Sequence, residues 1–164
     1  MMSTTLEYRD GDVRLKGVLV RDGKRTAGPA IVLFPDARGV GAHAIECAGR
    51  LAALGYLTLV ADLYGEGILA RASPRPADAA NIKAKVLICH GAADPLVPPA
   101  EVAAFEEEMG RTKVDWQLHV YGGAVHAFTN PEAGNAGNAA FAYNEAADRR
   151  SWSAMLGLLQ EAFA

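Results

Sequence analysis

The sequence predicts an α/β fold in which a largely parallel sheet is flanked by helices. Strand-like apolar runs alternate along the chain with amphipathic stretches of helical period, which is the order that builds βαβ units. Two of the runs, at 30–34 and 85–91, read as strands buried on both faces, as is typical of parallel sheets. Crossovers between such strands are expected to be right-handed.

The first half of the chain is expected to supply three strands and one helix. An Asp-Gly turn at 22–23 punctuates the first strand, Pro35 ends the second, and Gly55 stops the helix. The helix carries its apolar residues along one stripe, which indicates packing on the sheet. In order, these elements are an outer strand at 13–20, a buried strand at 30–34, a helix at 42–54 and a buried strand at 56–63.

The second half repeats the alternation and closes with a long helix. Three consecutive glutamates, at 106–108, are expected on a solvated helix face, and an apolar stripe from Trp152 to Phe163 is expected to pack the last helix. The elements are a strand at 85–91, a helix at 99–109, a strand at 116–121 and a helix at 143–163.

Length and composition indicate one globular domain that spans residues 1–164. The chain has 17.3 kDa and is 51% hydrophobic, which suits a single packed core. A net charge of −3 without a run of Lys or Arg disfavours nucleic acid and anionic membranes as partners. No apolar run is long enough to span a bilayer, and the N-terminal residues lack the features of a signal peptide. We therefore expect a cytoplasmic protein.

The two cysteines and their neighbours predict neither a disulfide nor a metal site. Cys47 falls in a helix-like stretch and Cys89 in a strand-like one, so reduced thiols are favoured, although one pair leaves a bridge open. Cys89 and His90 look like a zinc pair, but adjacent strand residues point to opposite faces. No metal and no cofactor are expected.

Asp94 and His126 are the candidate catalytic residues. Asp94 follows the strand at 85–91, and His126 lies in a loop after the strand at 116–121. An acid after one strand and a histidine after the next is the order in which α/β-hydrolases supply the acid and base of their triad. Each residue also has a simpler interpretation, as a turn aspartate before Pro95 and as a loop histidine. If both are catalytic, they should share a hydrogen bond at the carboxyl edge of the sheet.

Several motifs make the chain resemble the dienelactone hydrolase family. They cover nearly the whole chain in the family's order, and they are specific, because other hydrolases share the acid and base but not Asp-Leu-Tyr-Gly or His-Ala-Phe. The motifs are Pro-Asp-Ala-Arg-Gly-Val at 35–40, Arg-Leu-Ala-Ala-Leu-Gly-Tyr at 50–56, Asp-Leu-Tyr-Gly at 62–65, His-Gly-Ala-Ala-Asp-Pro-Leu-Val-Pro at 90–98 and Val-His-Ala-Phe-Thr-Asn-Pro at 125–131.

The resemblance implies an internal deletion that removes the nucleophile. In the family a cysteine in a Gly-x-Cys-x-Gly elbow lies between the Asp-Leu-Tyr-Gly strand and the acid strand. This chain contains no Gly-x-Cys-x-Gly or Gly-x-Ser-x-Gly motif, and the interval from about 67 to 82 is too short for the missing strands and helices. We expect a shortened, α/β-hydrolase-like sheet of about six strands, in which the strands at Ile31 and Val86 become parallel neighbours.

The resemblance also suggests residues around the rim of the site. Ala37 is the residue whose backbone N–H would contribute to an oxyanion hole, beside Arg38, although a plain strand-to-helix turn explains the same loop. Glu66 would line the same rim, unless its loop is simply solvated. The nucleophile itself is unknown.

Three other residues carry a thiol or hydroxyl that could replace the nucleophile. Cys89 is expected to be an inert core thiol, Cys47 to lie on a helix away from the chemistry, and Ser73 to lack a strained elbow. None of them replaces the family cysteine.

The sequence therefore predicts a carboxylic ester or lactone hydrolase by resemblance, with little or no activity. The alternative is a non-catalytic remnant that uses an exposed sheet face for self-association or interaction. Loss of the covering helices would expose an apolar face of the sheet, and such a face promotes association. We therefore expect a homodimer or larger homo-oligomer, for which domain swapping is one route. If the protein is active, its remaining partner is a small ester or lactone substrate.

Overall fold

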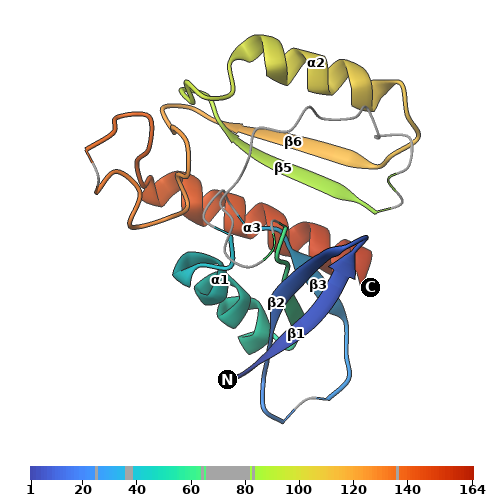
Figure 1. The fold of residues 1–164 in the computed structure, drawn as a ribbon. Coiled ribbons are helices and arrows are strands. Elements are labelled where there is room, and N and C mark those ends of the chain that lie inside the picture. The colour runs from blue at the N-terminus through green and yellow to red at the C-terminus, as the bar shows by residue number, and fades with distance from the viewer. Residues whose placement is uncertain (25, 36–38, 64, 66–81, 83, 136) are drawn as a thin grey trace. The chain divides into compact units, whose positions relative to one another are not determined.

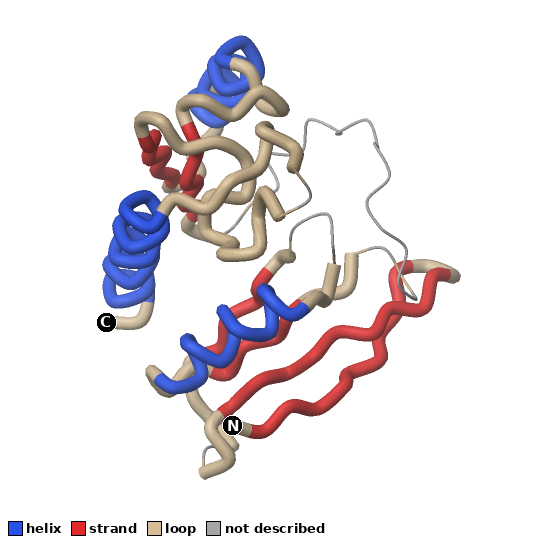
Figure 2. The backbone as a smooth tube through the Cα atoms, turned by 90° about the vertical axis from the view of Figure 1, so that its left-hand side faces the viewer, coloured by secondary structure: helices blue, strands red, loops and turns tan. Residues whose placement is uncertain are grey.

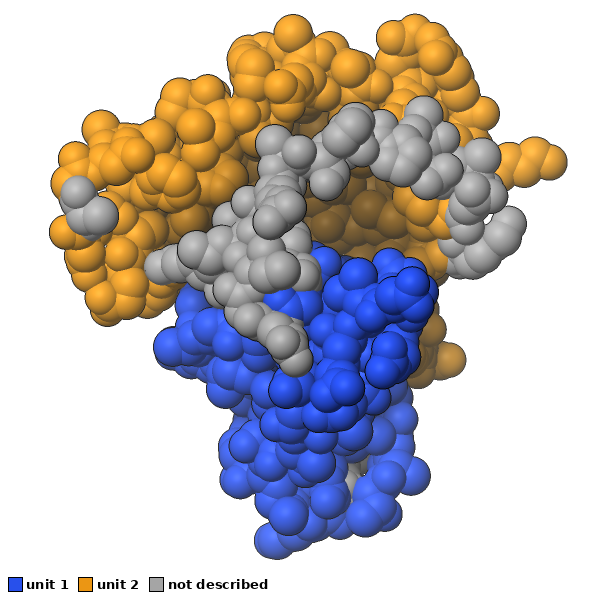
Figure 3. All heavy atoms as spheres, in the orientation of Figure 1, with its two compact units in different colours: residues 1–73 blue, residues 74–164 orange. Residues whose placement is uncertain are grey.

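The computed structural model describes all of the chain except residues 25, 36–38, 64, 66–81, 83 and 136. Its contacts group into two compact units, residues 1–73 and residues 74–164 (Figure 3). The organisation of residues 1–164 as a single domain stays a prediction. The described elements, shown in Figure 1, are β1 Met2–Asp10, β2 Val13–Arg21, β3 Ala30–Leu33, α1 Ala42–Ala53, β4 Leu57–Val60, β5 Val86–Gly91, α2 Pro99–Gly110, β6 Trp116–Tyr121 and α3 Glu145–Ala162.

The first unit is built on a four-stranded sheet in the order β1-β2-β4-β3. β1 and β2 form an antiparallel hairpin in which Asp10 faces Val13. Between them Gly11 has φ of 55°, a left-handed conformation that tight hairpin turns require and that glycine adopts without a steric cost. β2 is antiparallel to β4, and β4 is parallel to β3. The sheet is therefore mixed.

Helix α1 covers one face of this sheet, as Figure 2 shows. Ala48 and Ala52 on the helix and Val60 on β4 have no exposed surface. Alanines on the contact face let the helix approach the strands closely, and the β-branched valine fills the space between them. This packing forms the core of the first unit.

The opposite face of the same sheet carries exposed apolar side chains near β3. Val32 is 52% exposed and Phe34, just after the strand, is 69% exposed. In the parallel register Val32 faces Leu59 of β4, while the next residue, Leu33, packs with the core under α1. Successive strand residues point to opposite faces, so Val32 belongs to the side away from α1.

The second unit is a βαβ arrangement with an added helix. β5 and β6 pair in parallel from Val86 opposite Trp116 to Gly91 opposite Tyr121, and α2 connects them along the chain. α3 packs on the other side of this sheet, where Ala147 joins a buried cluster with Tyr121 and Phe128 (Figure 1). Asn144 caps α3 by accepting a hydrogen bond from the N–H of Ala147 at 3.0 Å.

The structure confirms the α/β class, but it corrects the predicted sheet. The described strands form one four-stranded and one two-stranded sheet, and two of the four pairings are antiparallel. The strands at Ile31 and Val86, expected to be neighbours, belong to different sheets. None of the described helices has the length and apolar character needed to cross a membrane.

Candidate functional site

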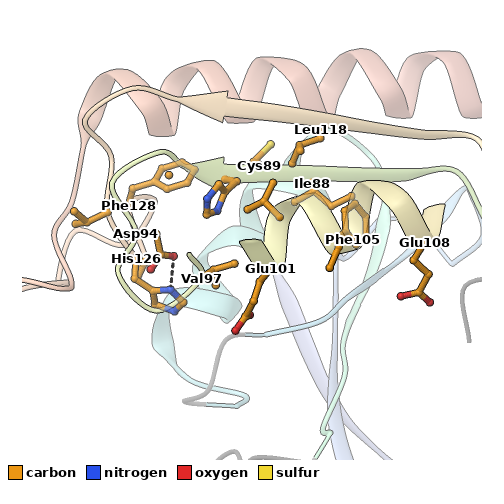
Figure 4. A pocket seen from close by; sticks show the side chains of 16 residues that line it. Ile88, Cys89, Asp94, Val97, Glu101, Phe105, Glu108, Leu118, His126 and Phe128 are labelled. Atoms are coloured by element: carbon orange, nitrogen blue, oxygen red, sulfur yellow. Dashed lines mark hydrogen bonds and ion pairs between the residues drawn. The ribbon is translucent and has the colours of Figure 1, made fainter. Parts of the chain in front are cut away.

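Asp94 and His126 come together beyond the carboxyl ends of the two parallel strands of the second unit. β5 ends at Gly91 and β6 at Tyr121, and these two residues are register partners. The loops that follow bring Nδ1 of His126 to 2.8 Å from Oδ2 of Asp94 (Figure 4). The predicted hydrogen bond is therefore confirmed, and it lies at the sheet edge where ligands of α/β proteins gather.

Both oxygens of the Asp94 carboxylate have a hydrogen-bond partner. Its side chain is 6% exposed, and Oδ1 accepts the backbone N–H of Leu96 at 2.8 Å while Oδ2 faces the imidazole. The backbone N–H of Asp94 in turn donates to the carbonyl of Gly91 at 3.0 Å. A buried carboxylate fixed in this way orients a histidine and stabilises its protonated form.

His126 has a fixed ring but remains accessible. Its side chain is 35% exposed. A carboxylate only accepts hydrogen bonds, so Nδ1 of His126 carries the hydrogen that is donated to Asp94. The neutral ring therefore keeps an electron pair on Nε2. The ring of Phe141 packs edge-on against the imidazole, with centroids 5.1 Å apart and planes at 83°. The arrangement offers Nε2 as a base.

The backbone around His126 is tied to the segment that precedes α3. The N–H of His126 donates to the carbonyl of Ala140 at 3.1 Å, and the N–H of Ala142 donates to the carbonyl of His126 at 3.4 Å. These bonds place Phe141 beside the imidazole. Phe141 is not predicted from the sequence, because nothing in the local pattern at 138–144 indicates which earlier residue this segment contacts.

The residue after the base adopts a strained conformation. Ala127 has φ of 57°, a left-handed conformation that costs a non-glycine residue roughly 1–2 kcal/mol. It opens a turn that is closed by a hydrogen bond from the N–H of Asn130 to the carbonyl of Ala127 at 2.9 Å. Phe128, which is 6% exposed, anchors the turn against Tyr121 at a centroid distance of 5.4 Å. Strain of this kind gathers at functional sites.

A cavity of about 570 Å³ opens beside the hydrogen-bonded pair. It is bounded by β5, α2, one residue of β6 and the loop at 125–128, all within the second unit. Apolar side chains such as Ile88 and Phe105 form much of its wall, and Glu101 and Glu108 enter it from α2 (Figure 4). Its size and mixed lining suit a small organic ligand.

Cys89 does not have the surroundings of an activated nucleophile. Neither cysteine forms a disulfide. Burial raises the pKa of the Cys89 thiol, and a weak hydrogen bond from the Tyr121 hydroxyl, at 3.7 Å, opposes this effect only in part. Cys89 is therefore a poor thiolate source, in agreement with the expectation of an inert core thiol. Cys47 lies on α1 in the first unit, 3.8 Å from Nε2 of His43.

The remaining predicted rim residues, Ala37, Arg38 and Glu66, lie outside the described residues, as does Ser73. Their roles stay predictions. Among the residues that the structure describes, no three of the types His, Cys, Asp and Glu gather closely enough to hold a metal ion.

Comparison with known proteins identifies the relatives of the chain. The model of the dienelactone hydrolase family matches it in two segments, residues 15–75 and 70–163. Two solved structures each align over 99% of both chains with a TM-score of 0.88. One, 29% identical, is described as a dienelactone hydrolase-like promiscuous phosphotriesterase from metagenomic libraries, and the other, 30% identical, is named m3DLH.

Two further matches are more distant or shorter. A putative dienelactone hydrolase from Klebsiella pneumoniae is 17% identical with a TM-score of 0.72 over 96% of this chain and 97% of that one, which bears on the fold alone. A protein of Caenorhabditis elegans described as uncharacterized is 39% identical over 79 residues, or 48% of this chain. The chain spans about half the length of this curated relative.

Proposed function

Because the chain belongs to the dienelactone hydrolase family, we propose that it is a weak hydrolase of carboxylic esters or lactones in which His126 activates water directly. Dienelactone hydrolase-like relatives share its α/β fold over nearly its full length. The observation that carries the proposal is the hydrogen bond of 2.8 Å between the partly exposed imidazole of His126 and the buried carboxylate of Asp94. In hydrolytic triads a pair of this kind serves as the acid and the base.

The reaction follows from the geometry of the pair. Nε2 of His126 removes a proton from a water molecule as the water oxygen attacks the carbonyl carbon of the ester. Asp94 stabilises the imidazolium that forms, through the proton on Nδ1. The tetrahedral intermediate then expels the alcohol oxygen, to which the imidazolium returns its proton. The products are a carboxylic acid and an alcohol, and the base is restored.

The activity is proposed to be weak because the family's nucleophile has no counterpart in the sequence, which holds no Gly-x-Cys-x-Gly or Gly-x-Ser-x-Gly motif. Loss of the nucleophile from a triad lowers turnover on the order of 10⁶-fold in a well-studied serine hydrolase. Without a covalent intermediate, the reaction is not divided into two easier steps. We expect rates no more than marginally above those of free imidazole.

Hydrolysis of 4-nitrophenyl acetate by the purified protein tests the proposal. His126→Ala should remove most of the small rate, and Asp94→Asn should lower it, because the asparagine no longer stabilises the imidazolium. Cys89→Ala and Cys47→Ala serve as controls that leave the rate unchanged. Fast, saturable turnover that either cysteine change abolishes would show that a new nucleophile has been recruited and would overturn the mechanism. Because one relative is described as a promiscuous phosphotriesterase, diethyl 4-nitrophenyl phosphate belongs in the same assay.

A second candidate function is self-association through the first unit. The exposed side chains of Val32 and Phe34, beside β3, favour a homo-oligomer. β3 is the last strand of the sheet that the structure describes, and apolar surface near an edge strand promotes contact between copies. Sedimentation velocity of the full chain tests this. A dimer that Phe34→Asp converts to a monomer would support it, and a monomer at all concentrations would exclude it. A cytoplasmic location is also proposed, supported by the two free cysteines.

A further inference from the structure

We propose that the cavity beside His126 holds the acyl chain of an aliphatic ester, and that Phe105 sets the length of the chain that it accepts. The inference rests on the proposed hydrolytic function, because it names the substrate class of that same site. It depends on the apolar surface along the cavity, on the place of the base relative to that surface, and on the aromatic ring that stands partway along it.

The apolar side chains between the two-stranded sheet and α2 leave part of their surface uncovered. Ile88 of β5, Leu118 of β6 and Phe105 of α2 are only half-buried, and all three line the cavity. Within α2, which the structure describes along its whole length, Met109 is the one buried residue. Side chains between a sheet and a helix are usually packed against each other. This wall therefore offers apolar surface that a hydrocarbon chain can cover, and such burial is favourable.

The acid and base lie at one end of this apolar wall. In Figure 4 the side chains of Val97 and Ile88 lie between His126 and Phe105. An ester carbonyl attacked by a water molecule on Nε2 of His126 therefore has an apolar path for its acyl chain, past Val97 and Ile88 toward Phe105. The alcohol oxygen takes its proton from the same Nε2, where the side chain of His126 is 35% exposed. The alcohol thus leaves toward solvent, and the acyl group is the part that occupies the cavity.

The two glutamates of α2 at the cavity do not interrupt this path. In Figure 4 the carboxylates of Glu101 and Glu108 point away from Ile88 and Leu118. Both charges can therefore stay hydrated, which avoids the cost of burying them, while the chain lies against the strands.

Phe105 is the residue placed to end this path. Its ring packs edge-on against Trp116, with centroids 5.8 Å apart and planes at 86°, a favoured aromatic geometry that holds the ring in place. Along α2, Phe105 lies about 6 Å beyond Glu101, at a rise of roughly 1.5 Å per residue, and this is close to the length of a butanoyl chain. The cavity continues past Phe105 to Glu108. A smaller side chain at position 105 should therefore admit a longer chain.

A purely structural role for Phe105 predicts a different behaviour. If the ring only packs against Trp116, its replacement lowers the stability of the protein and weakens the activity toward esters of every length alike. The ratio between esters of different length then stays unchanged. The preferred chain length is therefore the readout that separates the two roles.

The expected size of the effect follows from the transfer of methylene groups out of water. Each methylene that enters the cavity should raise kcat/KM or the binding constant roughly three- to fourfold. Lengthening the acyl group from acetyl to butanoyl adds two methylenes, so the wild-type protein should gain roughly tenfold. Beyond the length that Phe105 allows, further methylenes should bring no gain, because they stay in water or crowd the ring.

The test uses the 4-nitrophenyl esters of acetic, butanoic, hexanoic and octanoic acid, below the concentrations at which the longer esters aggregate. Each kcat/KM is divided by the rate constant of free imidazole with the same ester, which removes differences in intrinsic reactivity. The wild-type protein should show its optimum at the butanoate. Phe105→Ala should move the optimum to the hexanoate or octanoate, and Phe105→Trp should move it toward the acetate. Phe105→Leu is a milder change that keeps the test valid if the alanine variant does not fold.

Met109→Ala is the matched control. Met109 lies on the same helix, is 1% exposed and is not among the described residues that line the cavity. Its replacement should lower the stability of the protein, as the loss of a buried side chain does, and leave the optimum at the butanoate.

Binding separates failure of this inference from failure of the proposed hydrolysis. Isothermal titration with the anilides of the same four acids, which resist hydrolysis, measures the chain-length preference without turnover. An affinity optimum that Phe105→Leu moves to a longer chain supports the inference even if no ester is cleaved. Ester cleavage with the same relative rate for every chain length overturns the inference and leaves the hydrolysis standing. It is also overturned if Met109→Ala moves the optimum as far as Phe105→Leu does, or if no anilide binds, as when part of the protein itself fills the cavity.

Discussion

Replacing Gly91 by alanine should disturb the acid and the base together. A Cβ built on Gly91 would lie 2.5 Å from the carbonyl oxygen of Ala124 and 2.8 Å from that of Val125. Both atoms are backbone, so no side-chain rotation relieves the contact. The nearer gap must widen by about 0.9 Å to reach the 3.4 Å at which ordinary contact begins.

The magnitude follows from the groups that must move. Overpacking of this kind costs about 1–3 kcal/mol. The Ala124 carbonyl also accepts the N–H of Ala93 at 2.9 Å, and loss of that bond adds about 1 kcal/mol. We expect Gly91→Ala to lower the free energy of unfolding of the second unit by about 2–4 kcal/mol, with the loop that carries His126 displaced from Asp94.

Two measurements check this result. Both tryptophans, Trp116 and Trp152, lie in the second unit, so their fluorescence in a urea titration follows that unit. Proton NMR follows the low-field Nδ1–H resonance of His126, which should weaken or shift. Gly122→Ala is the control, because a Cβ there meets nothing within 4 Å, and its effect should stay within about 0.5 kcal/mol. A Gly91→Ala protein as stable as this control, with the resonance intact, would refute the reasoning.

Three further predictions concern the surroundings of the site. Burial, together with the hydrogen bond to Cys89, raises the pKa of Tyr121 from 10.0 to about 12. The unfolded chain therefore loses this proton first, and the free energy of unfolding should fall as pH rises from about 10 to 12. Urea titrations should show a shallower fall for Tyr121→Phe. Phe141→Leu should lower the His126-dependent ester rate severalfold while circular dichroism stays unchanged, whereas an unaltered rate would mean that the ring does not position the imidazole. Because burial also raises the pKa of Cys89, iodoacetamide should alkylate Cys89 more slowly than it alkylates the thiol of glutathione at pH 8. Peptide mass spectrometry measures the rate, and equal rates for the two thiols would contradict the burial of Cys89.

Elements with a clear period were predicted well, and pairing between elements was not. The helix expected at 99–109 is observed as Pro99–Gly110, and the strand expected at 116–121 is observed with those bounds. Apolar spacing reports which face of an element is buried, but it does not report which edge pairs with which. The expected pairing of the strands at Ile31 and Val86 rested on the second kind of information, and the structure assigns the two strands to different sheets.

Turns and strand ends can be predicted from the local sequence, whereas contacts between distant residues cannot. The two-residue turn Gly11-Asp12 joins β1 and β2, and Gly-Asp is a pair typical of hairpin turns. The strand β1 was therefore missed although its signal was present. The hydrogen bond between Asp94 and His126 was predicted correctly, because strand ends and residue types together fix it. Phe141 and the left-handed Ala127 depend on contacts with distant residues, which the sequence pattern does not contain.

The residues that form the site of the second unit are close in sequence, and this affects how Asp94 and His126 are brought together during folding. Asp94 and His126 are separated by 32 residues, and the described residues that line the cavity run from Ile88 to Phe128. Closing a loop of this length has a modest entropic cost, which grows slowly with the number of residues enclosed. A strand, its crossover helix and the next strand emerge consecutively from a ribosome, so the pair is assembled from neighbours in time. Insertions and losses before residue 86 therefore leave the order of this assembly untouched.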